Sequence, residues 1–153
     1  SKTIGQNIDL ALNIREGLSE PQRREMIRES LQRVSMEGTE DMYPEELSGG
    51  MIKRAAIARA IAPQPEYLLY DEPTTGLDPV LSRKISDLII KLDEELQTSS
   101  MVISHDISSI PTFSDRIAMM HAGRIVLTCP ADQMWNQENE VFNDFLYGTM
   151  ENV

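Results

Sequence analysis

The sequence YLLYDEPTTGLDP, at residues 67–79, combines signals for a strand, a turn and the start of a helix. Its first four residues form a short apolar run that ends at Asp71 and Glu72, which is typical of a buried strand in a parallel sheet. Asp78 is a favourable helix cap and Pro79 is a favourable first helical residue. The stretch therefore predicts a buried strand, a tight loop and a helix in immediate succession.

A second strand completes the pattern. The predicted helix carries an apolar stripe at Leu81, Ile85, Leu88, Ile89, Leu92 and Leu96. Residues 100–104 then form another short apolar run, predicted to be a second buried strand, which ends at His105. Strand, helix and strand in this order predict a parallel sheet, whose carboxyl edge is the usual place for a ligand. Asp71, Glu72 and His105 are thus candidate site residues, although carboxylates at a strand end and a single histidine are also common without any function.

A serine and two glycines precede these strands in the sequence LSGGM, residues 47–51, here called the LSGGM loop. Its glycines let a backbone pass close to a ligand, and residues 51–62 have a helical composition that ends at Pro63. Free N–H groups and the positive end of a helix dipole favour anions, most often phosphate. Ser48, Gly49 and Gly50 therefore predict an anion site, or else an ordinary glycine-rich turn.

The first 62 residues are predicted to be helical throughout and to form a separate lobe. Residues 3–14 predict a short helix, and Ser19 caps a second helix that is expected to end near Gly38. The charged outer face of that second helix is either a solvated surface or a partner-binding surface. Residues 39–46 are acidic and predict an irregular connection.

The remainder of the chain predicts a hairpin between short helices. A helix is expected around residues 107–113, followed by strands at 116–120 and 124–128 that flank a turn containing Gly123. Two short helices at 133–135 and 141–147 follow, the last ending at Gly148. We expect Trp135, Phe142 and Phe145 to be packing residues and assign no function to Cys129.

Composition excludes several classes of protein. The 153 residues carry a formal net charge of −11, which argues against a nucleic-acid binder. The single cysteine excludes an internal disulfide and favours the cytoplasm, and the two histidines have no zinc-ligand cluster near them. No apolar run approaches the roughly 20 residues of a membrane span, and no signal peptide is evident, so we do not expect this chain to enter a membrane by itself. Because it begins without methionine, we expect it to be cut from a longer protein.

Four motifs in this order resemble those of the ATP-binding cassette (ABC) family of transporter ATPases. Residues 47–51 resemble its signature loop, 67–72 its Walker B strand, 76–78 its D-loop and 104–106 its switch-histidine loop. Residues 46–51, 70–79, 115–119 and 145–148 most resemble the Mla/Mce-type phospholipid transport ATPases within that family. The resemblance implies a RecA-like α/β core of the P-loop NTPase fold with an inserted helical subdomain.

The resemblance also implies a role for each candidate site residue. Asp71 would serve Mg²⁺, Glu72 would be the catalytic base and His105 would contact the γ-phosphate of ATP. Ser48, Gly49 and Gly50 would contact ATP held by the opposite subunit, and Asp78 would lie at the dimer interface. The implied cofactors are ATP and Mg²⁺. The implied partners are a second nucleotide-binding subunit, forming a homodimer, and a membrane permease at the cytoplasmic face of the inner membrane, without nucleic acid.

One departure limits what the chain is expected to do alone. The phosphate loop of the family, Gly-x4-Gly-Lys-[Ser/Thr], is absent from the sequence, and Met51 replaces the commoner glutamine of the signature loop. The expected fold is therefore a helical subdomain at 1–63, the C-terminal half of a truncated RecA-like core at 64–129 and a helical tail at 130–153. The expected function is that of an ABC transporter ATPase fragment, inactive alone, which in the complete protein couples ATP hydrolysis to transport of phospholipid or another lipid or organic solute.

Two other functions stay open at this point. The C-terminal lobe of a coiled-coil chromosome or DNA-repair ATPase carries similar motifs, but the helical segment before Leu47, the absence of heptads and the acidic charge disfavour it. A non-enzymatic interaction module would explain the missing phosphate loop.

Overall fold

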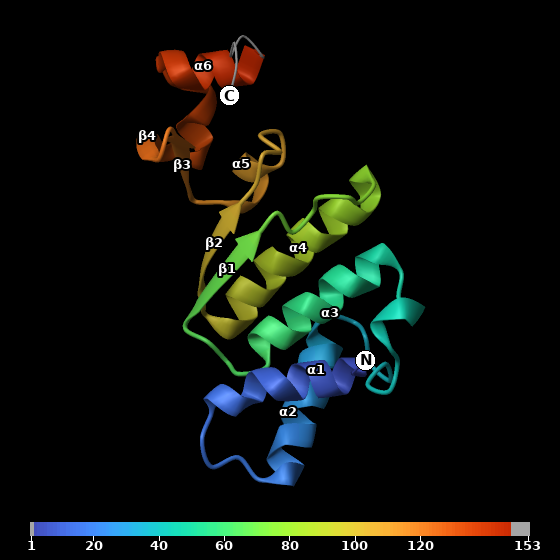
Figure 1. Cartoon of the computed structure of the whole chain (residues 1–153). Coiled ribbons are helices and arrows are strands. Elements are labelled where there is room, and N and C mark those ends of the chain that lie inside the picture. Colours follow the sequence, from blue (N-terminus) through green and yellow to red (C-terminus); the bar gives the residue numbers. More distant parts are fainter. Residues whose placement is uncertain (1, 148–153) are drawn as a thin grey trace. The chain divides into compact units, whose positions relative to one another are not determined.

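The computed structural model describes residues 2–147 and divides the chain into two compact units, Ser1–Ile103 and Ser104–Val153 (Figure 1). Gly148, the expected end of the last helix, lies outside the described residues. Within the first unit the helical residues and the sheet share one hydrophobic core, which joins Ile8, Leu12 and Leu31 to Leu68 and Leu92. The divisions expected after residues 63 and 129 stay predictions.

Local signals produce the helices of the first unit as expected. Thr3 and Ser19 form capping boxes at the starts of the first two helices, and Ser48 caps the third. The elements are α1 (Ile4–Ala11), a 3-10 turn (Leu12–Ile14), α2 (Glu20–Arg33), a second 3-10 turn (Pro44–Glu46) and α3 (Gly49–Ile61).

Helix α2 ends earlier than the sequence predicts. Its last residue is Arg33, well before Gly38, because Ser35 adopts a left-handed backbone with φ 55°. The guanidinium of Arg54 donates hydrogen bonds to the carbonyl oxygens of Val34 at 3.3 Å and Ser35 at 3.0 Å. A cation from α3 therefore binds the carbonyl groups that the end of α2 exposes.

The predicted parallel sheet is confirmed. Strands β1 (Tyr67–Asp71) and β2 (Ser99–Ile103) pair in parallel, with Tyr67 opposite Ser99 and Asp71 opposite Ile103. Helix α4 (Pro79–Leu96) connects them and lies beside the sheet (Figure 1). Its predicted stripe is buried at Ile85, Ile89 and Leu92 and half-buried at its other positions. The first unit is thus an α/β structure with helices packed on one sheet face.

The two strands are not buried on both faces, which corrects the expectation from their apolar composition. Leu68 and Tyr70 are buried against the helices, but Tyr67 and Leu69 of the same strand are 71% and 75% exposed. Met101 and Ile103 of β2 are 55% and 51% exposed on the face shared with Leu69. The apolar run was expected to have a cover on each side, and this unit supplies a cover on one side only.

The second unit contains the predicted hairpin. Strands β3 (Arg116–His121) and β4 (Arg124–Pro130) pair antiparallel around Ala122 and Gly123, whose φ values are 47° and 74°. Two successive positive φ values are the hallmark of a type I′ turn, and glycine adopts one without strain. The remaining elements are α5 (Ile110–Phe113), a 3-10 segment (Ala131–Asn136) and α6 (Glu140–Tyr147).

The aromatic residues of the second unit divide between core and surface. Phe142 is buried with Ile117, Cys129 and Met134, which confirms its predicted packing role. Trp135 is 59% exposed and Phe145 is 40% exposed, so the same prediction is wrong for Trp135 and only partly met by Phe145. Met134, rather than its neighbour Trp135, takes the inward position of the 3-10 segment.

Candidate functional site

The LSGGM loop leads directly into α3. Ser48 has an extended backbone, and its hydroxyl accepts a hydrogen bond from the N–H of Met51 at 3.4 Å. Gly49 and Gly50 form the first turn of a 13-residue helix, and Ser48 and Gly49 are exposed. The exposed backbone of Ser48 and Gly49 and the positive end of the helix dipole therefore lie at the surface here, which suits an anion.

Neither space nor backbone strain within the chain requires glycine in this turn. A methyl group on Gly49 would lie 3.7 Å from Leu77 Cδ2, and one on Gly50 would lie 3.5 Å from Leu81 Cδ2, which are ordinary contacts. Both glycines also avoid the left-handed region of φ. The exposed Gly49 leaves room for an outside group to approach the backbone closely.

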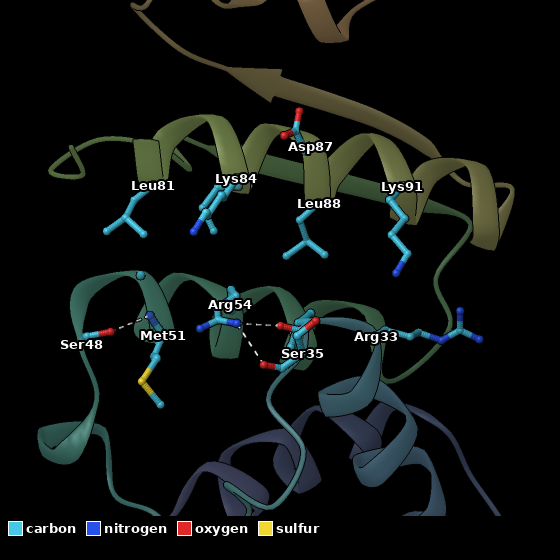
Figure 2. A pocket seen from close by; sticks show the side chains of 13 residues that line it. Arg33, Ser35, Ser48, Met51, Arg54, Leu81, Lys84, Asp87, Leu88 and Lys91 are labelled. Atoms are coloured by element: carbon cyan, nitrogen blue, oxygen red, sulfur yellow. Dashed lines mark hydrogen bonds between the residues drawn. The ribbon is translucent and has the colours of Figure 1, made fainter. Parts of the chain in front are cut away.

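A groove of about 370 Å³ adjoins the LSGGM loop, between α4 on one side and α3 with the end of α2 on the other (Figure 2). Leu81 and Leu88 point from α4 toward α3, whereas Asp87 points away from it. The cationic residues that line the groove are Arg33, Arg54, Lys84 and Lys91.

Several of these cations already have partners inside the chain. Arg54 binds the end of α2, and Glu95 pairs with Arg33 at 3.3 Å and Lys91 at 3.6 Å. Lys84 forms no ion pair within residues 2–147. On a chain with a net charge of −11, this is a local positive region beside the LSGGM loop, and it favours the approach of an anion.

Glu72 occupies a constrained turn after β1. Its φ is 48°, a left-handed backbone conformation that residues with a side chain rarely adopt. Its N–H donates to the carbonyl oxygen of Ile103 at 2.9 Å. Its own carbonyl oxygen accepts hydrogen bonds from Lys53 Nζ at 3.1 Å and from the N–H of Thr75 at 3.3 Å. The Thr75 hydroxyl donates to Glu72 Oε2 at 2.6 Å. Backbone and carboxylate are thus both held in place.

Asp71 is the last residue of β1, and it is exposed. Within residues 2–147 no three His, Cys, Asp or Glu side chains gather closely enough to hold a metal ion. Mg²⁺ is often bound by one or two carboxylates together with substrate phosphates and water. A single exposed carboxylate fits that arrangement, in which the nucleotide brings the metal, and does not fit a metal site built by the protein alone.

Asp78 caps α4, as its sequence predicts. Its Oδ1 accepts hydrogen bonds from the N–H groups of Val80 at 2.9 Å and Leu81 at 3.0 Å. This contact accounts for the aspartate without any partner subunit. A role for Asp78 at a dimer interface stays a prediction.

His105 is exposed and belongs to the second unit. The adjacent Asp106 organises its loop, because its N–H donates to Ser104 Oγ at 3.1 Å and its Oδ1 accepts from Ser108 Oγ at 2.6 Å. The hydrogen bond from Ser108, with a further one from Ser109, lowers the pKa of the Asp106 carboxyl below 3.8. A contact between His105 and phosphate stays a prediction.

The first unit thus brings together the LSGGM loop, the Asp78 turn and the Glu72 turn. Two residues that sequence analysis did not select contribute, namely Lys53 and Thr75. Lys53 carries no sequence signal of this role, because it contacts a backbone oxygen 19 residues away. Thr75 stands three residues after Glu72, which is the spacing of a local side-chain turn and could have been recognised.

The fold is that of the P-loop NTPases. Two solved structures are similar to this chain. One is cbiO1 from Clostridium perfringens, part of the ABC transporter complex cbiONQ, with a TM-score of 0.80 and 28% identity over 95% of this chain and 58% of that one. The other is the ATP-binding cassette MJ0796, in a dimeric post-hydrolysis state bound to ADP and phosphate, with a TM-score of 0.72 and 34% identity over 85% of this chain and 57% of that one.

The family model described as ABC transporter matches residues 1–75 of this chain. The iron(III) import ATP-binding protein FbpC of Mannheimia succiniciproducens is 34% identical over 92% of this chain. The methionine import ATP-binding protein MetN 3 of Bacillus cereus is 36% identical over 95% of it. The chain spans 40% and 43% of the length of these two relatives. Among residues 2–147, no helix is both long and apolar enough to cross a bilayer.

Proposed function

We propose that this chain is part of the ATP-hydrolysing subunit of an ABC transporter and supplies residues to two nucleotide sites. The observation that carries the proposal is that one compact unit holds both an exposed, serine-capped glycine turn and a constrained glutamate at the carboxyl end of β1. The glycine turn would bind the phosphates of ATP held by a second copy. Glu72 would act on ATP held by its own subunit.

Each side chain then has a defined task. The carboxylate of Glu72 orients the attacking water and takes up its proton, a contribution worth roughly 10²–10⁴ in rate. The Thr75 hydroxyl, which donates to Glu72 Oε2 at 2.6 Å, orients that carboxylate. Asp71 would hold Mg²⁺ bound to the nucleotide, and this ion would supply charge neutralisation at the phosphates. His105 would contact the γ-phosphate.

We also propose that a further lobe is needed for activity. The sequence contains no phosphate loop, and the face of the sheet at Leu69, Met101 and Ile103 is exposed. Parallel strands occur almost always in sheets covered on both faces. A lobe carrying the phosphate loop would cover this face and bind the triphosphate, so the 153-residue chain alone should bind Mg-ATP very weakly.

The proposed partners are a second copy of the nucleotide-binding subunit and a membrane permease at the cytoplasmic face of the inner membrane. The names of the two relatives specify import of iron(III) ions and of methionine, so they support transport but give no support to a lipid. The resemblance of residues 46–51 and 115–119 to phospholipid transport ATPases is what supports phospholipid, or another lipid or organic solute, as the cargo. The names of these relatives do not favour a chromosome ATPase.

The variant Glu72→Gln tests the proposal in the complete ATPase. Loss of ATP hydrolysis with retained ATP binding is the expected result, because glutamine keeps the shape of the side chain but cannot accept the proton. Hydrolysis at the wild-type rate would remove Glu72 from its role. Calorimetry on the 153-residue chain is the second test, and micromolar binding of Mg-ATP would refute the need for a further lobe.

A further inference from the structure

Helix α3 is linked to the Glu72 turn by one side chain. Lys53 lies one helical turn after Gly49, is half-buried and donates a hydrogen bond from Nζ to the carbonyl oxygen of Glu72 at 3.1 Å. The donor is an ammonium group, and a charged donor makes a hydrogen bond roughly twice as strong as a neutral one. The helix that begins at the LSGGM loop is therefore hydrogen-bonded to the residue proposed as catalytic base.

The Glu72 backbone requires such an attachment. A left-handed residue with a side chain costs about 1–2 kcal/mol, and it persists only where surrounding contacts hold it. Ile103 in β2 fixes the N–H of Glu72 at 2.9 Å, on the amino side of the residue. Lys53 fixes the carbonyl oxygen, on the carboxyl side, in a peptide bond to Pro73 that has no N–H of its own.

These two contacts together determine where the carboxylate points. With the peptide planes on both sides of Glu72 held, φ and ψ are fixed and the Cα–Cβ bond has one direction. The Thr75 hydroxyl then selects the orientation of the carboxylate at the end of that side chain. Loss of the Lys53 contact would remove the shorter of the two hydrogen bonds described at the Glu72 carbonyl oxygen and loosen this plane, while the 3.3 Å hydrogen bond from the N–H of Thr75 remains.

We propose that Lys53 is a positioning residue that links the proposed catalytic glutamate to the helix that begins at the LSGGM loop. The inference rests on the proposed function, in which the LSGGM loop serves the nucleotide of the opposite subunit and Glu72 serves its own. Lys53 then connects the two nucleotide sites of the dimer within a single subunit. A shift of α3 when its first turn binds phosphate would reach Glu72 through this contact.

Kinetics of the complete ATPase tests this role with three variants. Lys53→Met keeps the aliphatic stem but removes the donor, and we expect kcat to fall about 10- to 100-fold with KM for ATP changed less than about twofold. Lys53→Arg keeps a charged donor and should restore most of kcat. Arg59→Met, at an exposed position of the same helix, is the matched control and should behave as wild type.

Amide hydrogen exchange supplies a readout that does not depend on hydrolysis. The N–H of Thr75 donates to the carbonyl oxygen that Lys53 holds, so its exchange should accelerate in Lys53→Met. Exchange at Leu92, in the core of α4, should stay at the wild-type rate if the effect is local.

Three results would overturn the proposal. One is a Lys53→Met variant with wild-type kcat. Another is exchange at Thr75 that is unchanged in Lys53→Met. Exchange accelerated at Thr75 and Leu92 in the same ratio would also overturn it, because equal acceleration indicates general destabilisation. If the wild-type ATPase does not hydrolyse ATP, the proposed function fails by itself, and exchange at Thr75 alone decides whether Lys53 holds the turn.

Discussion

The hydroxyl of Thr75 donates a hydrogen bond to Oε2 of Glu72 at 2.6 Å, within a turn that the N–H of Thr75 closes onto the Glu72 carbonyl oxygen at 3.3 Å. The same residue thus contacts both the backbone and the carboxylate of Glu72. A carboxylate held in this way spends less time in other orientations, so we predict that Thr75 contributes to hydrolysis if Glu72 is the catalytic base.

Replacing Thr75 by valine should slow hydrolysis without unfolding the turn. Valine has the same shape, and the backbone hydrogen bond from residue 75 remains. We expect kcat of the complete ATPase to fall about 3- to 10-fold, the effect of losing one hydrogen bond worth roughly 1 kcal/mol. Thr128→Val, at an exposed position of β4, is the control. Equal rates for both variants would mean that Thr75 does not orient Glu72.

Two substitutions at Asp78 distinguish its role as a helix cap from a role at a dimer interface. Asp78→Ala should lower the free energy of unfolding by about 0.5–2 kcal/mol, because the N–H groups of Val80 and Leu81 lose their acceptor. Asp78→Asn keeps an acceptor and should be nearly as stable as wild type in denaturant titrations. If the charge of Asp78 also serves a dimer interface, the asparagine variant will dimerise less with ATP despite its stability. Equal stability of the alanine variant and wild type would contradict the cap.

Tyr70 provides a test of the core beneath the site. Its hydroxyl is buried without a hydrogen-bond partner in the described part of the chain, and burial raises the pKa of Tyr70 to about 12. In the unfolded chain the tyrosine has its ordinary pKa of 10.0, so it ionises at a lower pH there than in the folded chain. The stability that is present below pH 10 should therefore be lost as the pH rises toward 12.

The variant Tyr70→Phe removes both the buried hydroxyl without a partner and its ionisation at high pH. The variant should be as stable as wild type at pH 7, or more stable by about 1 kcal/mol, because no hydrogen bond is lost and a buried polar group is removed. It should also lose less stability than wild type above pH 10. Destabilisation by Tyr70→Phe at pH 7 would indicate a hydrogen bond that the geometry does not contain.

Asp106 gives a test of the loop that carries His105. Hydrogen bonds from Ser108 and Ser109 lower the pKa of its carboxyl, so the stability that it contributes is present above its unfolded value of 3.8 and is lost as the pH falls through the lower folded value. Titration followed by NMR should show an Asp106 pKa below 3.8, and Ser108→Ala should raise it. An unchanged value in that variant would show that Ser108 is not the main cause.

Sequence reasoning succeeded where the signal is local. The caps at Ser19 and Asp78 and the turn at Gly123 each depend on residues within a few positions, and each is confirmed. The parallel pairing of β1 and β2 was predictable because a helix connects them. These features together placed the candidate site at the carboxyl end of β1.

Features that depend on contacts between distant segments could not be predicted from the sequence. The early end of α2 depends on Arg54, 20 residues beyond Val34, and the Glu72 turn depends on Lys53. An apolar run also cannot reveal which of its faces another layer will cover, so the exposure of Leu69 was not predictable from composition. Long side chains that reach backbone oxygens leave no periodic pattern in a sequence.

ATP hydrolysis by two mixed dimers of the complete ATPase tests whether the LSGGM loop serves the nucleotide of the opposite subunit. Gly49→Asp places a negative charge where phosphate would bind, at an exposed position with room for a side chain, and Glu72→Gln removes the base. If the LSGGM loop serves the opposite subunit, a dimer with one substitution on each chain keeps one complete site and should hydrolyse ATP. A dimer with both substitutions on one chain and a wild-type partner keeps no complete site and should be inactive. The reverse order of the two activities would contradict the account.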